Sequence, residues 1–377
     1  MKRWLYSLTI FGLVAMAACA GEEETTPSPS GPAPTASAAW EQEWGQVLAA
    51  AKREGKVVVA GPSGADTRRA LTEPFEQKYG ITVEYQPFSG PEFVPKVKAE
   101  REANLYLWDL FIGGTSTPVL ELRPAGILDP IEPALILPEV KDGKNWMGGQ
   151  PYLVDKDRTV LGTTASGTPA LVINTNMVKA EEFRSYKDIL DPKWKGKIMM
   201  HDPRISGSGQ SRMHFFYVNP QLGPDFIRAL ARQEPMIGRD QNENLTGLAQ
   251  GKAPICVGCS ESRAGIMIRA GAPIALVGPD QMKEGGSTSV SSGGVGLISK
   301  RPHPNAAAVY LNWLLSKEGQ TGFSKAEGIA SRRVDVPTDH LDPWAVPKPA
   351  YIPLDGEEAL LLRRNVVLAF VKEVFGE

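Results

Sequence analysis

Apolar residues recur along the chain in patterns that alternate between strand and helix. Residues 57–60 form a continuous apolar run of strand length, residues 71–79 carry apolar side chains at helical spacing, and residues 81–85 alternate as in a half-buried strand. Pro91 suits the first position of the next helix, and residues 109–112 predict another strand. This order of strands and helices predicts an α/β fold with a mostly parallel sheet and right-handed crossovers.

A second set of elements begins near Ala165. Apolar runs predict strands over residues 170–173, 197–200, 254–257, 274–277 and 295–298. Helical spacing predicts helices over residues 181–189, 225–232, 243–250 and 260–269, and one that starts near Gln210. Residues 357–374 predict a terminal helix that packs on one lobe of the fold, with Arg363 and Arg364 on its solvated face.

The first residues have the pattern of an export signal. Lys2 and Arg3 precede an uncharged run, which predicts a signal peptide over residues 1–18. The residues around Cys19 resemble the lipobox of bacterial lipoproteins, in which the cysteine is the lipid attachment site. Residues 19–39 are acidic and then rich in Pro, Ser, Thr, Gly and Ala, which predicts a flexible linker. We expect an exported protein in the periplasm or on the outer face of the cell membrane; the alternative is a plain signal peptide with an incidental cysteine.

Composition excludes several classes of function. The formal charge of −2 becomes −4 after processing, because removal of Lys2 and Arg3 reduces 41 basic residues to 39 against 43 acidic ones. That charge gives no global attraction for nucleic acid, so no nucleic-acid partner is expected. Four histidines and three cysteines are too few for a disulfide-rich scaffold or a typical zinc enzyme, and neither a cofactor nor a bound metal is expected.

Small and hydroxyl-bearing residues gather where four of the predicted strands end. In open α/β sheets the loops at the carboxyl ends of the strands line the ligand crevice, and the backbone N–H groups of a following helix favour anions or polar oxygens. One such loop is more simply a turn, but four at equivalent places predict a cleft. The candidate ligand-binding residues in these loops are Ser63, Gly64, Ser89, Gly90, Gly114, Thr115, Ser116, Ser206, Ser208 and Gly209.

Four stretches of the chain resemble a known family. Residues 194–198, 294–300, 304–307 and 311–320 are similar to the extracellular solute-binding proteins of ABC importers, in the branch that includes ferric-iron, thiamine and phosphonate receptors. The resemblance covers residues 41–336. It implies a two-lobe type 2 periplasmic-binding-protein fold, in which each lobe is a mostly parallel sheet flanked by helices and two β-strand crossings join the lobes.

The same resemblance implies the domain division and the partners. Lobe one would comprise residues 40–164 plus 286–377, and lobe two residues 165–285. The ligand binds between the lobes, because only the closed state makes both sets of contacts. The expected partners are a small-molecule solute and an ABC permease with its ATPase in the membrane, and the protein is expected to be a monomer.

The predicted ligand follows from a departure from that family. Ferric-binding members place adjacent tyrosines at a strand end in lobe two, whereas the matching stretch here reads Gly258-Cys259-Ser260 and no two tyrosines adjoin. What remains is a hydroxyl-rich site, in which Cys259, Ser260 and Glu261 are further candidate ligand-binding residues and Arg204 adds a cationic fork for a small anionic solute. The alternative for Arg204 is a surface charge beside Asp202. The alternative cargo is a ferric ion, or another metal held by Cys259 and Glu261.

The spacing of Cys256 and Cys259 allows two interpretations. A zinc site needs more Cys or His ligands than the sequence places nearby. The pair therefore predicts either a local structural disulfide, which an oxidising compartment permits, or two small buried residues.

Two other classes of function remain open from sequence. A secreted enzyme could use the same cleft, but no nucleophile–base motif is present, and only His201 stands beside a proposed cleft loop. A sensory receptor that feeds a signalling partner would have the same sequence features. We predict a binding protein and not an enzyme.

Overall fold

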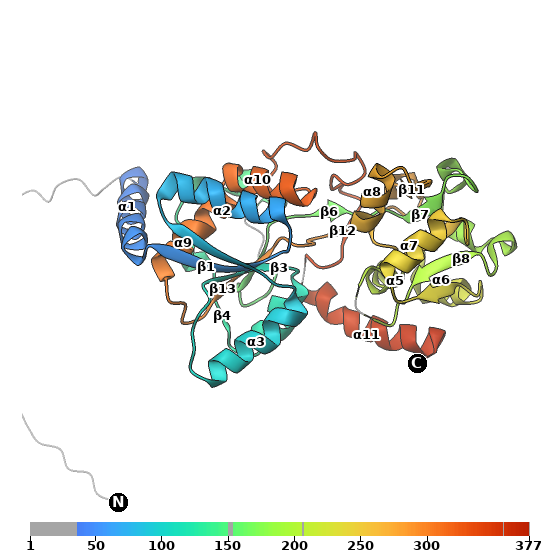
Figure 1. Ribbon diagram of the computed structural model, residues 1–377, viewed down its shortest axis with the longest axis horizontal. Helices are drawn as coiled ribbons and strands as arrows, with labels where there is room; N and C mark the ends of the chain where they lie inside the picture. Colours follow the sequence, from blue (N-terminus) through green and yellow to red (C-terminus); the bar gives the residue numbers. More distant parts are fainter. Residues whose placement is uncertain (1–35, 150–153, 206, 357, 377) are drawn as a thin grey trace, which may run out of the picture.

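The computed structural model describes residues 36–149, 154–205, 207–356 and 358–376. The predicted signal peptide, Cys19 and the linker up to residue 35 lie outside the described residues, as does Ser206. The described chain forms two sheets with separate hydrophobic cores, joined through a small third sheet (Figure 1). None of its helices combines the length and the apolar character needed to cross a membrane.

Lobe one is built on a six-stranded sheet in the order β2-β1-β3-β13-β4, with β5 also paired to β13. β1 is parallel to β2 and β3, as the first half of the sequence predicted, whereas β13 is antiparallel because it returns from the other lobe. The strands are β1 Lys56–Gly61, β2 Thr82–Pro87, β3 Leu110–Gly113, β4 Leu128–Asp129, β5 Val160–Gly162 and β13 Gly294–Ile298. The helices are α1 Ala36–Glu54, α2 Ala65–Tyr79, α3 Gly90–Glu102, α4 Pro138–Lys141, α9 Pro304–Leu315 and α10 Lys317–Glu327.

Lobe two is built on a five-stranded sheet in the order β11-β7-β10-β8-β9. β10, β8 and β9 are parallel, and β7 is antiparallel to both β10 and β11. The strands are β7 Leu171–Asn174, β8 Ile198–His201, β9 Met236–Gly238, β10 Ile255–Val257 and β11 Ile274–Val277. The helices are α5 Ser208–Val218, α6 Gly223–Ala231, α7 Gln241–Ala249 and α8 Glu261–Arg269.

The helix predicted over residues 181–189 is wrong. The chain there forms short 3-10 turns, Ala180–Glu182 and Tyr186–Leu190. Asp188 Oδ2 accepts from the backbone N–H of Ser185 at 2.8 Å, and Ser185 Oγ accepts from the N–H of Lys187 at 3.1 Å. Such side chains offer the backbone an alternative to helical hydrogen bonds, so they favour turns over a continuous helix.

Two chain crossings join the lobes. The first passes from β5 through β6 (Ser166–Gly167) to β7, and the second from β11 through β12 (Ser287–Ser289) to β13. β6 and β12 pair antiparallel, and β14 (Ile352–Pro353) adds a parallel strand to β12. The two expected β-strand crossings are therefore present, held side by side in one small sheet.

The terminal helix α11 (Glu358–Phe375) does not pack on one lobe only. In Figure 1 it runs from the region of α3 to the underside of α5 and α6. Leu361 is buried in the lobe-one cluster that contains Phe93, whereas Val367 and Val371 are buried in the core of lobe two. The helix consequently contacts both lobes.

Candidate functional site

A cavity of about 200 Å³ lies where β6–β7, the start of α5, the β10–α8 loop, β12 and α11 meet. Its wall is polar on several sides and carries acidic and basic side chains. The residues that line it are Thr168, Pro169, Ala170, Leu171, Val172, Ser208, Ser211, Arg212, Cys256, Gly258, Cys259, Ser260, Glu261, Ser287, Ser289, Leu354, Asp355 and Arg364. Four of the predicted site residues are among them, namely Ser208, Cys259, Ser260 and Glu261.

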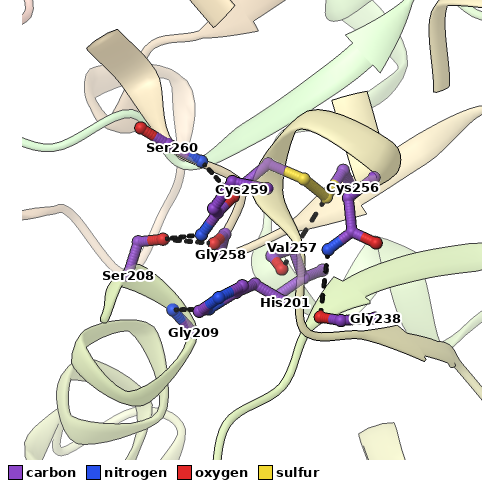
Figure 2. Close-up of a disulfide and its surroundings, with 11 residues drawn as sticks. His201, Ser208, Gly209, Gly238, Cys256, Val257, Gly258, Cys259 and Ser260 are labelled. Carbon is purple, nitrogen blue, oxygen red and sulfur yellow. Dashed lines mark hydrogen bonds between the residues drawn. A yellow bond between two sulfur atoms is a disulfide. The ribbon is translucent and has the colours of Figure 1, made fainter. Parts of the chain in front are cut away.

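One wall is formed where the β10–α8 loop packs against the start of α5. Ser208 Oγ donates to the carbonyl oxygen of Gly258 at 2.6 Å, and Figure 2 shows Ser208 and Gly209 facing this loop. Gly258 has a φ of +70°, and a Cβ atom there would come within 2.7 Å of Gly209 Cα. Gly209 itself donates its N–H to His201 Nδ1 at 3.3 Å. This close approach explains why glycine is needed on both sides of the contact.

Cys256 and Cys259 form a disulfide in this wall (Figure 2). Of the two interpretations that the spacing allowed, the structure contains the disulfide. Cys256 is fully buried and Cys259 is 5% exposed. Both sulfur atoms are used in the bond, so Cys259 offers no thiolate to a metal, and its role as a metal ligand is corrected to that of a wall residue.

Arg212, on α5, is the basic side chain from lobe two, and it is 6% exposed. Its Nη2 donates to the carbonyl oxygen of Pro169 and reaches Thr168 Oγ1 at 3.4 Å, both of which are neutral acceptors. Its Nε and Nη1 are buried with no hydrogen-bond partner, and no ion pair links it to any carboxylate in the described part of the chain. The charge of Arg212 acts on Glu261 in the same cavity, but no hydrogen-bonded ion pair joins the two among the described residues, and a buried guanidinium outside such a pair is costly.

Arg364, on α11, is the second basic side chain of the cavity. Its Nη1 donates to Ser116 Oγ at 2.6 Å, and its Nη2 donates to Ser211 Oγ at 2.9 Å. Both partners are neutral hydroxyl groups, and the buried Nε has no partner within the described ranges. The expectation that Arg364 lies on a solvated face is therefore wrong, although Arg363 beside it is exposed.

Two carboxylates share the cavity with these arginines. Asp355 is held inside the protein, because its oxygens accept from the N–H of Val290 and from Ser289 Oγ, each at 2.7 Å. Glu261 starts α8 and also lines a second, wider space of about 600 Å³. Its side chain is solvent-accessible, while desolvation by nearby protein atoms raises the pKa of its carboxyl group, against the opposing charge of Arg212.

Arg204 does not line this cavity. Its Nε donates to Asp202 Oδ1 at 2.8 Å and its Nη1 to the carbonyl oxygen of Gly376 at 3.1 Å. The Arg204 hydrogen bond is the main reason that the pKa of Asp202 is lowered to about 2. The structure thus corrects the predicted anion-binding role of Arg204 and favours the alternative of a charge paired with Asp202.

The candidate residues of the lobe-one loops are not brought together with the cavity. Ser89 begins α3, with its Oγ donating to Glu92 at 2.7 Å, and Thr115 Oγ1 donates to the carbonyl oxygen of Asp355 at 2.8 Å. Ser116 reaches the cavity only through Arg364, and with Gly90 it lines a separate shallow groove beside α3. Ser63, Gly64, Ser89 and Gly114 are exposed and do not line this cavity, and their contact with a ligand stays a prediction.

The arrangement does not resemble a metal centre. Within residues 36–149, 154–205, 207–356 and 358–376, no group of three or more His, Cys, Asp or Glu side chains is placed to hold an ion. No tyrosine of the described chain lines the cavity. Hydroxyl groups and guanidinium groups instead offer hydrogen-bond donors to oxygen atoms of a ligand.

Arg212, Arg364, Ser211 and Asp355 were not predicted as site residues. Arg212 follows the Ser208–Gly209 loop on the next helical turn, so the helix start did carry a signal for it. Arg364 had no such signal, because its contact with the cavity depends on where α11 crosses the two lobes.

Comparison with known proteins identifies the family. Residues 70–348 match the model of the bacterial extracellular solute-binding proteins. An uncharacterized protein of Haemophilus influenzae is 25% identical over 280 residues, which cover 73% of this chain and 77% of that protein. The ferric iron-binding protein A of Mannheimia haemolytica in an open conformation has a TM-score of 0.66 at 18% identity, covering 85% of this chain and 98% of that one. The periplasmic binding protein AfuA of Actinobacillus pleuropneumoniae with bound fructose-6-phosphate has a TM-score of 0.60 at 20% identity, covering 86% and 99%.

This chain belongs to the bacterial extracellular solute-binding proteins, because the family model matches most of its length. It is a substrate-binding protein of the ABC-importer type, with the two-lobe type 2 fold of its structural neighbours.

Proposed function

We propose that this solute-binding protein captures a small anionic organic solute in the cavity between its lobes and delivers it to a membrane permease. The single observation that carries the proposal is Arg212, which is 6% exposed and has neutral partners only. An anionic ligand would supply the missing counter-charge and accept from Nε and Nη1. Ser208, Ser260 and Glu261 are proposed to contact the same ligand.

Iron is the competing cargo, because several structural neighbours are described as ferric-binding proteins. Hard phenolate or carboxylate donors suit ferric ion, whereas guanidinium groups repel it. The disulfide further removes the only thiols of the described wall from metal binding. These features support an anionic solute over a metal ion.

A thermal-shift screen of the mature protein tests this proposal. The panel comprises sugar phosphates, phosphonates, carboxylates, inorganic oxyanions, thiamine, polyamines and ferric chelates. A true ligand at a hundredfold excess over its Kd stabilises the fold by about 2.7 kcal/mol. The strongest shift is expected with an anion, and titration calorimetry then measures its Kd. A shift with ferric ion alone would contradict the proposal, and turnover of a bound compound would show an enzyme.

We further propose that residues 1–18 are removed and that Cys19 carries the lipid that tethers the protein to the membrane. The domain division remains lobe one at residues 40–164 plus 286–377 and lobe two at 165–285, with α11 shared between them. Metabolic labelling with a radioactive fatty acid tests the anchor. The Cys19→Ala variant should lose the label and appear in the soluble exported fraction, while a Cys256→Ala and Cys259→Ala double variant should keep it.

A further inference from the structure

Helix α11 is fixed to lobe one at its start and to lobe two at its end. Glu358 Oε1 pairs with Arg123 Nη2 at 2.7 Å, and the N–H of Glu358 donates to the carbonyl oxygen of Val154 at 3.0 Å. Near the other end, the ring of Phe370 packs edge-on against Tyr217, with centroids 5.4 Å apart. The helix therefore spans the interlobe region as a third connection, in addition to the two strand crossings.

Arg364 lies where this helix passes the cavity. Its guanidinium joins Ser116, in the loop after β3 of lobe one, to Ser211, on α5 of lobe two. A guanidinium has five N–H donors, and the two hydroxyl groups use only two of them. The remaining donors include the buried Nε. Arg364 consequently has capacity for a ligand while it already holds both lobes.

No ion pair joins Arg364 to a carboxylate among the described residues, although Asp355 lines the same cavity. The hydrogen-bond partners of Arg364 are two neutral serines, and the buried His214 nearby has its pKa lowered to about 4, first by burial and then by the charges of Arg364 and Arg363. The imidazole is therefore uncharged at neutral pH. Arg212 and Arg364, from two different elements, both line the same cavity.

We propose that Arg364 binds the solute directly and shares its anionic group with Arg212, so that the C-terminal helix is part of the binding site. This inference rests on the proposed function. The ligand class is a small solute with an anionic group that presents at least two oxygen atoms, one for each guanidinium. Separation of the lobes must break the bond of Arg364 to Ser116 or to Ser211, so a bound anion favours the state in which α11 stays on both lobes.

Replacement of Arg364 tests the proposal by titration calorimetry. Sulfate, phosphate, methylphosphonate and acetate serve as probes, with the mature wild-type protein, Arg364→Gln, Arg364→Lys and Arg363→Gln. Arg364→Gln should weaken the best probe about 10- to 100-fold, because hydrogen bonds to charged groups contribute about 1.5–3 kcal/mol. Arg364→Lys should recover part of this loss, because it keeps the charge without the fork. Arg363→Gln is the matched control on the same helix, and its Kd should stay within about twofold of the wild type.

Hydrogen exchange supplies a readout of α11 itself. Saturating probe should slow amide exchange over residues 361–371 in the wild type and in Arg363→Gln, but much less in Arg364→Gln. An Arg364→Gln variant that binds as tightly as the wild type, while Arg212→Met does not bind, would overturn the role of α11 and leave the proposed function standing. If the wild type binds none of the anions and α11 exchanges identically in all variants, both proposals fail.

Discussion

Two neighbouring regions of lobe two differ in the hydrogen-bond partners that they provide for an arginine. In the loop after β8, Arg204 faces the buried carboxylate of Asp202, with Nε–Oδ1 at 2.8 Å and Nη2–Oδ2 at 3.1 Å, and Arg239 approaches the same carboxylate at 3.1 Å. On α5, Arg212 is buried, and its hydrogen bonds within the described chain go to the carbonyl oxygen of Pro169 and the hydroxyl of Thr168, while its guanidinium lies over the rings of Phe215 and Phe216. In the first region the fold provides a carboxylate that hydrogen-bonds the arginine, and in the second it provides neutral acceptors.

This difference separates a structural charge from a binding charge. In a buried ion pair, the attraction between the two charges offsets much of the free energy that is lost when they leave water. A buried charge outside an ion pair has no such offset, so it destabilises the ligand-free protein. Local violations of the rule that buried charges are paired occur mostly at functional sites. To identify a ligand-binding arginine, its position beside a glycine-rich loop is thus less informative than whether the fold provides it with a carboxylate partner.

The largest expected effect is on ligand binding by Arg212→Met. The Kd of the best anion from the screen should rise about 100-fold or more, because at least two charge-assisted hydrogen bonds of about 1.5–3 kcal/mol are removed. The free energy of unfolding should change by less than about 1 kcal/mol, because an apolar side chain of similar length replaces an unpaired buried charge. Calorimetry gives the Kd, and urea unfolding gives the stability.

Arg204→Met is the matched control for that experiment. It removes a guanidinium from the same lobe, and the Kd should stay within about twofold of the wild type because Arg204 does not line the cavity. An Arg204→Met variant that lost binding as completely as Arg212→Met would break the distinction between the two regions.

A smaller effect is expected on stability from Asp202→Asn. The pKa of Asp202 is lowered from 3.8 to about 2, chiefly by the hydrogen bond from Arg204, so the ionised group stabilises the folded state above the unfolded pKa. That contribution is about 2 kcal/mol at pH 7, and it is lost as the pH falls through the folded pKa. Urea unfolding should show the wild type more stable than Asp202→Asn by this amount at pH 7, with the gap closing between pH 4 and pH 2.

Asp225→Asn controls for the loss of any paired aspartate. Asp225 pairs with Arg228 at 3.0 Å, but its side chain is 96% exposed, so its loss should change stability by less than about 0.5 kcal/mol. Equal losses in the two variants would mean that the Asp202 cluster is no more than a surface ion pair.

Much of the fold could be predicted because its signals are local. Apolar runs and helical spacing predicted most strands and helices near their observed positions, for example residues 57–60 within β1 and 254–257 around β10. The failure at 181–189 is also local in origin, since hydrogen bonds from Ser185 and Asp188 outweighed the apolar spacing there.

The site was less predictable because a cavity depends on how distant segments meet. Ser208 follows a strand end, so the loop rule found it, whereas Ser260 and Glu261 were found in the stretch that corresponds to the ferric site of the family. Arg364 is more than two hundred residues from Ser116 in the chain, and only the path of α11 brings them together. The sequence predicted Arg204, with pairing to Asp202 as the alternative, and it did not predict Arg212, because sequence spacing does not show which arginine lacks an ion-pair partner in the fold.

The smallest expected effect concerns Glu261, a carboxylate in the same cavity as the unpaired arginine. Desolvation raises its pKa, and a bound anion would repel its charged form, so anion binding should favour the protonated state. Affinity for an anion whose own charge is constant should therefore be greater at pH 5 than at pH 8, by about threefold to tenfold for charges several ångströms apart. Glu261→Gln should remove this pH dependence and bind more tightly than the wild type at pH 8. Glu243→Gln, on the exposed face of α7, should keep it. A pH profile that is the same in wild type and Glu261→Gln would show that the charge of Glu261 does not affect the bound anion.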